Sequence, residues 1–145
     1  MKYFLSILSI FTLLSCETAK ITEESEPENE LTGKWVLDYM SPVSGKDIDG
    51  LFKIQKPYLT FVDDTKVAAN NGCNNMAGEY KKDGKMIIFD TEKFRTTRMF
   101  CEGVDESAFP GILKTVNNYT IIDNGTKLML LTGDIVSMTF VKVDE

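Results

Sequence analysis

The sequence predicts a mainly β protein, an antiparallel β-barrel of about eight strands with one short helix inserted before the last three strands. From Leu31 onward, short segments alternate apolar and polar residues with a period of two. Turn-forming pairs such as Asp83-Gly84 separate these segments. A helical period appears only at residues 109–116. Closure into a small barrel is the most effective way for many similar antiparallel strands to hide their edges.

The expected strands are short runs whose apolar side chains fall on one face. Trp35, Leu37 and Tyr39 share a face of the first run, and Leu59 and Phe61 share a face of the second. Asp83-Gly84 is expected to form the two-residue turn of a hairpin over residues 78–89. Besides this hairpin, the predicted strands cover residues 33–40 and 56–62, which are the two runs just described, and residues 66–70, 92–100, 118–122, 127–132 and 135–143.

The single helix is expected to be two to three turns long. Its apolar stripe has the spacing i, i+3, i+4, i+7 and consists of Phe109, Ile112, Leu113 and Val116. Asp105 or Ser107 can act as its N-cap. Pro110 lacks a backbone donor, so the helix should begin at or near this residue, with a loose or kinked entry.

The first thirty residues are predicted to stand apart from the barrel. Residues 1–15 carry Lys2 and then an apolar run, as in the h-region of a secretion signal. The run ends in Leu13-Leu14-Ser15-Cys16, which resembles a bacterial lipobox, so Cys16 is the predicted lipidation site. The alternatives are an ordinary secretory signal with Cys16 incidental, or a buried apolar strand. Residues 16–30 are predicted to be a disordered acidic tether, and residues 31–145 the folded domain.

Charge argues against two classes of partner. The chain has 16 Lys+Arg and 22 Asp+Glu, but the tether holds six of the glutamates, so the domain itself is near neutral. No basic stripe is available to neutralise phosphates, and we therefore expect no nucleic-acid binding. An anionic bilayer would repel the tether. Membrane attachment is thus expected to come from acyl chains on Cys16.

Two separated motifs stand out in the domain. The pattern G-C-N-x-x-x-G-x-Y is matched by Gly72, Cys73, Asn74, Gly78 and Tyr80, and T-x-M-x-C by Thr97, Met99 and Cys101. In this order they resemble the META domain of HslJ-like (heat shock protein HslJ) lipoproteins. The resemblance covers residues 31–143. It implies a small lipocalin-like barrel in the bacterial envelope and no agreed catalytic reaction. The chain departs from the pattern at Pro110-Gly111, where helix formers are expected, and after Cys101, where proline is common.

Apart from Cys16, two cysteines remain, Cys73 and Cys101. In an exported domain an even remainder indicates a disulfide, which is our leading interpretation. Free thiols, or a metal or redox site, are the alternatives. The chain has no histidine, and two thiolates fall short of the four ligands usual for zinc. We expect neither a metal nor a cofactor.

The segment NNGCNNMAG at residues 70–78 has two interpretations. Asparagine and glycine tolerate left-handed backbone, so the segment can shape a bend that directs Cys73 to its partner. Alternatively, Asn70, Asn74 and Asn75 offer amides to a sugar or peptide. Arg95 and Arg98 can likewise bind an anion, but pairing with acidic side chains on the surface is the favoured interpretation.

Catalytic candidates are few, and we expect no enzyme activity. Without histidine, acid-base chemistry would fall to a carboxylate or lysine with a strongly shifted pKa. The acidic pairs at residues 63–64 and 105–106 are expected to be solvated caps. Asp47-Ile48-Asp49-Gly50 resembles part of a calcium loop but lacks the later ligands, which favours a plain turn.

The leading functional hypothesis is a monomeric, membrane-anchored envelope lipoprotein that contacts an envelope protein or glycan, with a role under stress. The sequence does not distinguish the outer membrane, periplasmic and surface faces. A small-molecule carrier is the second hypothesis, with Trp35, Phe61, Ile87 and Met138 as candidate cavity residues. An inhibitor of a lytic enzyme such as lysozyme is the third.

Overall fold

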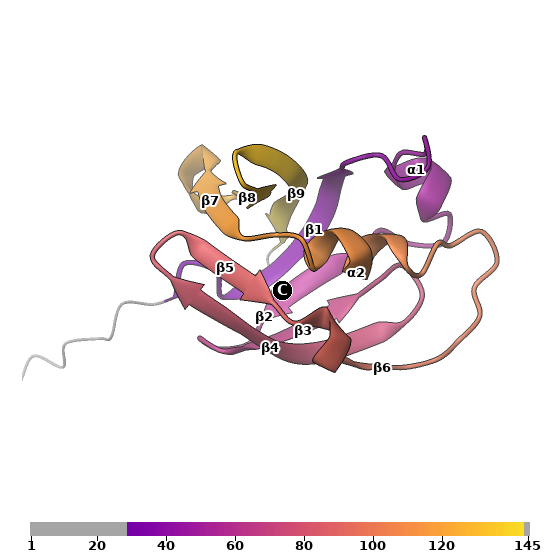
Figure 1. The fold of residues 1–145 in the computed structure, drawn as a ribbon, viewed down its shortest axis with the longest axis horizontal. Helices are drawn as coiled ribbons and strands as arrows, with labels where there is room; N and C mark the ends of the chain where they lie inside the picture. Colours follow the sequence, from indigo (N-terminus) through magenta and orange to yellow (C-terminus); the bar gives the residue numbers. More distant parts are fainter. Residues whose placement is uncertain (1–28, 144–145) are drawn as a thin grey trace, which may run out of the picture.

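A computed structural model of the chain describes residues 29–143 (Figure 1). The predicted signal segment, Cys16 and the tether up to residue 28 lie outside the described residues. No helix between residues 29 and 143 combines the length and apolarity needed to cross a membrane. The strands are β1 (Gly33–Met40), β2 (Tyr58–Phe61), β3 (Lys66–Asn70), β4 (Asn75–Asp83), β5 (Met86–Phe89), β6 (Arg95–Thr96), β7 (Asn118–Ile122), β8 (Lys127–Thr132) and β9 (Ile135–Val143).

Eight of these strands form a closed antiparallel barrel. Their order is β3-β2-β1-β9-β8-β7-β5-β4, and pairing of β3 with β4 completes the ring. The short strand β6 pairs with the start of β4, where Ala77 lies opposite Arg95. The predicted fold class is therefore confirmed, including the helix that precedes the last three strands.

The seam between β5 and β7 is the weakest in the ring. It has one register pair, Met86 with Asn118. Helix α2 (Ala108–Leu113) lies between the β7–β9 layer and the β2–β5 layer (Figure 1). Phe109 of this helix packs edge-on against Phe140 of β9, with ring centroids 6.4 Å apart. The helix thus contributes apolar surface to the interior beside a poorly paired seam.

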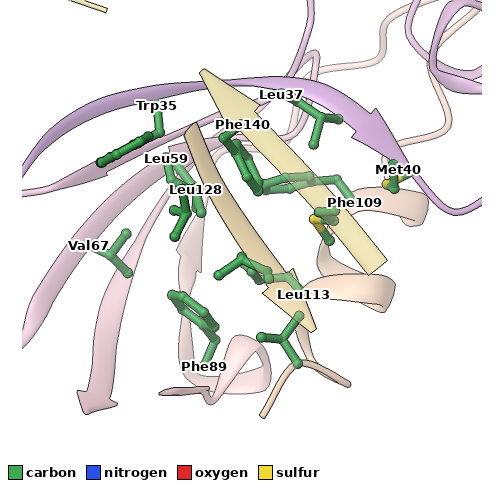
Figure 2. Close-up of a cluster of buried hydrophobic side chains, with 14 of the residues drawn as sticks. Trp35, Leu37, Met40, Leu59, Val67, Phe89, Phe109, Leu113, Leu128 and Phe140 are labelled. Carbon is green, nitrogen blue, oxygen red and sulfur yellow. The ribbon is translucent and has the colours of Figure 1, made fainter. Parts of the chain in front are cut away.

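The barrel interior is one continuous hydrophobic cluster (Figure 2). The predicted inward residues Trp35, Leu59 and Phe61 belong to it. So do Ile87 and Met138, so all four side chains considered for a ligand cavity are packed in the core. Burial of this apolar surface is the main favourable contribution to folding.

The expectation for Tyr39 was wrong. The register between β1 and β9 shifts between Leu37 and Tyr39, which marks a β-bulge. Because side chains alternate along a strand, the extra residue turns Tyr39 outward, 45% exposed, and turns Met40 into the core.

The strand predicted at residues 92–100 is also wrong over most of its length. Only Arg95–Thr96 is strand, and the helix η1 (Thr91–Lys93) precedes it. The Phe94 ring lies directly over Gly78, where an added Cβ would be 2.1 Å from Phe94 Cδ1. The chain then leaves the sheet because contacts from the β3–β4 connection hold it elsewhere, as described below.

The predicted turn of the β4–β5 hairpin is displaced by one residue. Asp83 lies opposite Met86, so the two central residues of the turn are Gly84 and Lys85, not Asp83 and Gly84. Gly84 has φ +56°, which suits glycine at the first central position.

Helix α2 begins two residues before Pro110 and is six residues long, shorter than expected. Ser107 occupies its N-cap position without a side-chain cap, whereas Asp105 Oδ1 accepts a hydrogen bond from the Ser107 hydroxyl (2.7 Å). The predicted stripe faces the core: Leu113 is fully buried and Ile112 packs against the core cluster.

The sequence Asp47-Ile48-Asp49-Gly50 begins a one-turn helix, α1 (Ile48–Leu51). Asp47 is its N-cap and accepts a hydrogen bond from Gly50 N at 3.0 Å. Within residues 29–143, no three His, Cys, Asp or Glu side chains are grouped to hold a metal ion.

The folded region begins before the predicted boundary at Leu31. Asn29 Nδ2 donates to the hydroxyl of Tyr80 at 2.8 Å, and Tyr119 donates to Glu30 Oε1 at 2.6 Å. Leu31 is fully buried, and its carbonyl accepts from the indole of Trp35 at 2.7 Å. Residues 29–31 therefore belong to this end of the barrel, which we call the tether end.

The tether-end network shifts two pKa values. The hydrogen bond from Tyr119 is the largest effect on the pKa of Glu30 and lowers it. Burial opposes this shift, and the nearby ammonium of Lys85 adds to it, so the pKa is lowered overall. Burial, and then the hydrogen bond to Glu30, raise the pKa of Tyr119. The pair therefore consists of a carboxylate and a neutral phenol at ordinary pH.

Candidate functional site

The connection between β3 and β4 is built from asparagine. We call residues 70–75 the asparagine scaffold. Asn70, Asn71 and Asn74 are all buried, which is unusual for this residue type. Buried amides need hydrogen-bond partners, so the positions of those partners show what the scaffold supports.

Asn70 and Asn71 support the scaffold and one neighbouring loop. Asn70 Oδ1 accepts from Gly72 N at 2.8 Å and from Gln55 Nε2 at 2.9 Å. Asn71 Oδ1 accepts from the backbone N–H of Asn74 at 2.7 Å. These short-range bonds imitate a backbone turn and bend the chain sharply between two strands.

Asn74 reaches across to a different part of the chain. Its Oδ1 accepts from Met99 N at 2.7 Å, and its Nδ2 donates to Met99 O at 3.0 Å. The hydroxyl of Thr97 also donates to Asn74 Oδ1, at 3.0 Å. A carboxylate oxygen of Glu106 accepts from Asn74 Nδ2 at 2.7 Å. The side chain of Asn74 therefore holds residues 97–99 in place through these hydrogen bonds.

The disulfide between Cys73 and Cys101 ties the scaffold to the same loop. It joins residues 28 positions apart, with Cα atoms separated by 5.8 Å. Gly72 has φ +95°, and an added Cβ there would be 2.8 Å from Phe52 Cδ1. The scaffold thus packs closely against the chain that follows α1. The disulfide interpretation of the two cysteines is supported.

The loop held in this way presents apolar side chains to solvent. We call residues 95–100 the distal loop. All of its side chains are exposed, and Phe100 is 89% exposed, the highest value among the exposed large hydrophobic residues. Met99 is 54% exposed. Ile54, on the loop that follows α1, is 60% exposed. The backbone N–H of Lys53 in that loop donates a hydrogen bond to the carbonyl of Gly103.

The distal loop and the tether end lie at opposite ends of the molecule. In Figure 1 the described chain begins at the left, whereas the orange loop between β6 and α2 and helix α1 lie at the right. The view has the longest axis horizontal, so these are the two ends of that axis.

Two open clefts mark the two ends. A cleft of about 570 Å³ lies between α1 and the loop before α2, with Lys46 and Lys53 opposite Asp105 and Glu106. Hydrogen bonding from Ser107 lowers the pKa of Asp105, so its carboxylate is occupied locally.

The second cleft, about 500 Å³, lies at the tether end. Its lining includes the ring of Tyr80, the exposed side chains of Met86 and Ile88, and Lys81 and Lys82. It lies beside the point where Asn29 enters the fold, since Asn29 bonds to Tyr80.

The predicted ligand contacts are not brought together as one open surface. Asn70 and Asn74 are buried and bonded within the chain, as the backbone-shaping interpretation expects. Asn75 and Arg98 are exposed. Contact of these four residues with a ligand stays a prediction.

Sequence reasoning missed Phe100, because the period of two placed it in a regular strand. The signal that could have identified it is its position directly before Cys101 and after Arg98, in a segment that a disulfide removes from the sheet.

The chain is similar to known proteins both in sequence pattern and in fold. A model of the META domain family matches residues 29–145. An NMR structure of a protein from Burkholderia xenovorans is similar, with a TM-score of 0.61 and 23% identity, over 94% of this chain and 100% of that one. A second NMR structure has a TM-score of 0.53 and 19% identity, over 77% of this chain and 90% of that one.

No curated protein matches the chain. At these identities the two NMR structures support the fold alone. The family model covers most of the chain and all of the described barrel. The chain belongs to the META domain family.

Proposed function

We propose that this protein is an HslJ-like lipoprotein of the bacterial envelope, anchored through acyl chains on Cys16, whose non-catalytic META domain binds another envelope protein. The apolar run of residues 3–14, the lipobox-like Leu13-Leu14-Ser15-Cys16 and the acidic segment after it support the anchor. A role under envelope stress follows from the HslJ resemblance.

The observation that carries the binding role is the exposure of Phe100 on a braced loop. An isolated exposed hydrophobic side chain needs no explanation. Here, however, a buried amide and a disulfide hold the loop from two sides. Aromatic residues, Met and Arg are the types enriched in interface cores, and the distal loop contains all three.

The position of this surface agrees with an anchored protein. The distal loop lies at the other end of the long axis from Asn29, where the tether joins (Figure 1). The distal loop is therefore remote from the residue at which the predicted anchor segment enters the fold.

Two measurements test the proposal. Metabolic labelling with radioactive fatty acid should mark the wild-type chain and not Cys16→Ser. Photocrosslinking from p-benzoylphenylalanine at position 100, in intact envelopes, should give a discrete protein adduct. The same photoprobe at Ile135, which is 72% exposed on the β8–β9 hairpin, is the matched control. Equal patterns from the two positions, across several stress conditions, would argue strongly against binding through the distal loop.

An inhibitor of a lytic enzyme is the second candidate, favoured by the same braced loop. A rigid projecting loop can enter a partner's cleft at little conformational cost. Purified protein should then lower the activity of lysozyme in a turbidity assay, and Phe100→Ser should relieve the effect. Unchanged lysozyme activity at a large excess of the protein would dismiss inhibition of this enzyme.

A further inference from the structure

The distal loop carries a specific charge pattern in addition to its apolar side chains. The chain contains two arginines, Arg95 and Arg98, and both lie in this loop. Both are exposed, and both precede the exposed apolar pair Met99-Phe100, with Arg98 directly before Met99. The rest of the positive charge is lysine, spread over the chain.

The two arginines differ from many of the lysines in their partners. Five lysines form ion pairs with a carboxylate of the same chain, namely Lys66, Lys85, Lys93, Lys114 and Lys127. Within residues 29–143, neither arginine forms such a pair, so the expectation that they pair with surface acids was wrong. The guanidinium group is planar and matches a carboxylate through two parallel hydrogen bonds. Both groups are therefore available to carboxylates of another molecule.

The backbone of the loop is already in place before any partner arrives. Asn74 bonds Met99 N and Met99 O, and the disulfide holds Cys101. Phe100 lies between these two attachments. A preorganised loop loses less conformational entropy on binding than a free one, so a small contact can be specific.

We propose that the binding partner is a protein with an apolar pocket edged by carboxylates, which takes Phe100 while its acidic rim meets Arg95 and Arg98. This inference rests on the proposed binding function and adds the chemistry of the partner. Two arginines are too few for a phosphate-tracking stripe, which argues against nucleic acid. An anionic bilayer would repel the acidic segment that leads from Cys16 to the domain, which argues against lipid as the ligand.

The test uses the full-length chain with the photoprobe at position 100, in envelopes isolated from its own bacterium. Arg95→Glu and Arg98→Glu are each expected to lower the yield of the adduct by about tenfold, because an acidic rim would then face like charge. Lys81→Glu, the same charge reversal at an exposed tether-end lysine, should leave the yield unchanged. Raising the ionic strength from about 0.05 to 0.5 M should also lower it.

The adducts then identify the partner by mass spectrometry, and the partner's crosslinked surface can be mutated. Replacing one rim carboxylate of the partner by lysine should restore the adduct with the Arg98→Glu variant. The same change in the partner should not increase the adduct with the wild-type chain. Urea unfolding of the arginine variants should match wild type, since both side chains are exposed.

The possible failures are distinct. If the yield of the position-100 adduct were unchanged by both arginine reversals and by salt, the acidic partner would be overturned and the proposed binding function would remain. An adduct with the mass of two copies of this chain, or one formed with lipid, would also overturn the inference. The absence of any position-specific adduct would remove the proposed binding function and this inference together.

Discussion

Asn74 holds the backbone of Met99 from both sides: its Oδ1 accepts from Met99 N at 2.7 Å and its Nδ2 donates to Met99 O at 3.0 Å. The two residues are 25 positions apart in sequence, and Met99 lies outside the strands of the barrel. This side chain takes the place of a β-ladder for the segment that presents Phe100. The interpretation of NNGCNNMAG as a backbone-shaping segment is consistent with these contacts.

Asn74→Ala should therefore be strongly destabilising. It removes an amide that satisfies several groups at once, and we expect a loss of about 2 to 4 kcal/mol in the free energy of unfolding, measured in urea. Asn75→Ala is the matched control, because Asn75 is exposed and its side chain accepts one amide hydrogen bond, from Asn70. It should cost about 1 kcal/mol or less. Similar losses for the two variants would contradict the role given to Asn74.

Removing the disulfide should weaken the fold without abolishing the barrel. A closed loop of 28 residues corresponds, in the chain-entropy model, to about 3 to 4 kcal/mol of stabilisation. Cys73→Ser/Cys101→Ser should show this loss in urea, and wild type with reductant should match the double variant. Wild-type stability that reductant leaves unchanged would show that the bridge is not formed in solution.

Gly78 leaves room for the ring of Phe94. An added Cβ would lie 2.1 Å from Phe94 Cδ1 and 2.4 Å from Phe94 Cε1, so Gly78→Ala should cost about 1 to 3 kcal/mol in urea unfolding. Gly111→Ala is the matched control, because nothing lies within 4 Å of its added Cβ and the residue is inside helix α2. That change should be neutral or stabilise by up to about 1 kcal/mol.

The turn between β2 and β3 makes stability depend on pH. Asp63 accepts from the backbone N–H groups of Thr65 and Lys66, which lowers its pKa from 3.8 to about 2. A lowered pKa contributes stability that is present above the unfolded-state value and is lost as the pH falls through the folded-state value. The urea midpoint of wild type should therefore decrease between about pH 4 and pH 2. Asp63→Asn keeps an acceptor oxygen without the charge, so its midpoint should decrease less.

Asp64→Asn removes the neighbouring carboxyl and is the control for this experiment. It should retain the wild-type pH dependence. If Asp63→Asn and wild type decreased in parallel across the same range, the turn would not be the source of the effect.

The tether end allows the boundary of the domain to be measured. A chain that begins at Leu31 lacks the hydrogen bonds that Asn29 donates to Tyr80 and that Tyr119 donates to Glu30, and should be less stable by about 1 to 3 kcal/mol in urea. A chain that begins at Asn29 keeps both contacts and should match one that begins at Glu17. Equal stability of the two shorter chains would place the boundary at Leu31, as the sequence alone predicted.

Most of the strand boundaries could be read from local pattern. The predicted ranges 33–40, 66–70, 118–122, 127–132 and 135–143 coincide with β1, β3, β7, β8 and β9. A strand with one buried face shows its period of two in any short window, so no distant residue is needed to recognise it. The helix stripe could be found for the same reason, with a period of 3.6.

The candidate site could be predicted only in part. The two cysteines and the asparagines were recognised as unusual, but the partners of those asparagines were not. Asn74 bonds groups at positions 97, 99 and 106, and local sequence says nothing about such distant pairings. The same holds for the bulge that turns Tyr39 outward, because it depends on how β1 meets β9.

The sequence by itself determined the family, the β-barrel class, the strands with a clear period of two and the two cysteines that pair. The tertiary structure alone decided that Phe100 projects into solvent and that residues 29 and 30 belong to the fold. Periodicity and turn chemistry act over a few residues and are written locally. The exposure of a side chain depends on what the rest of the chain places beside it.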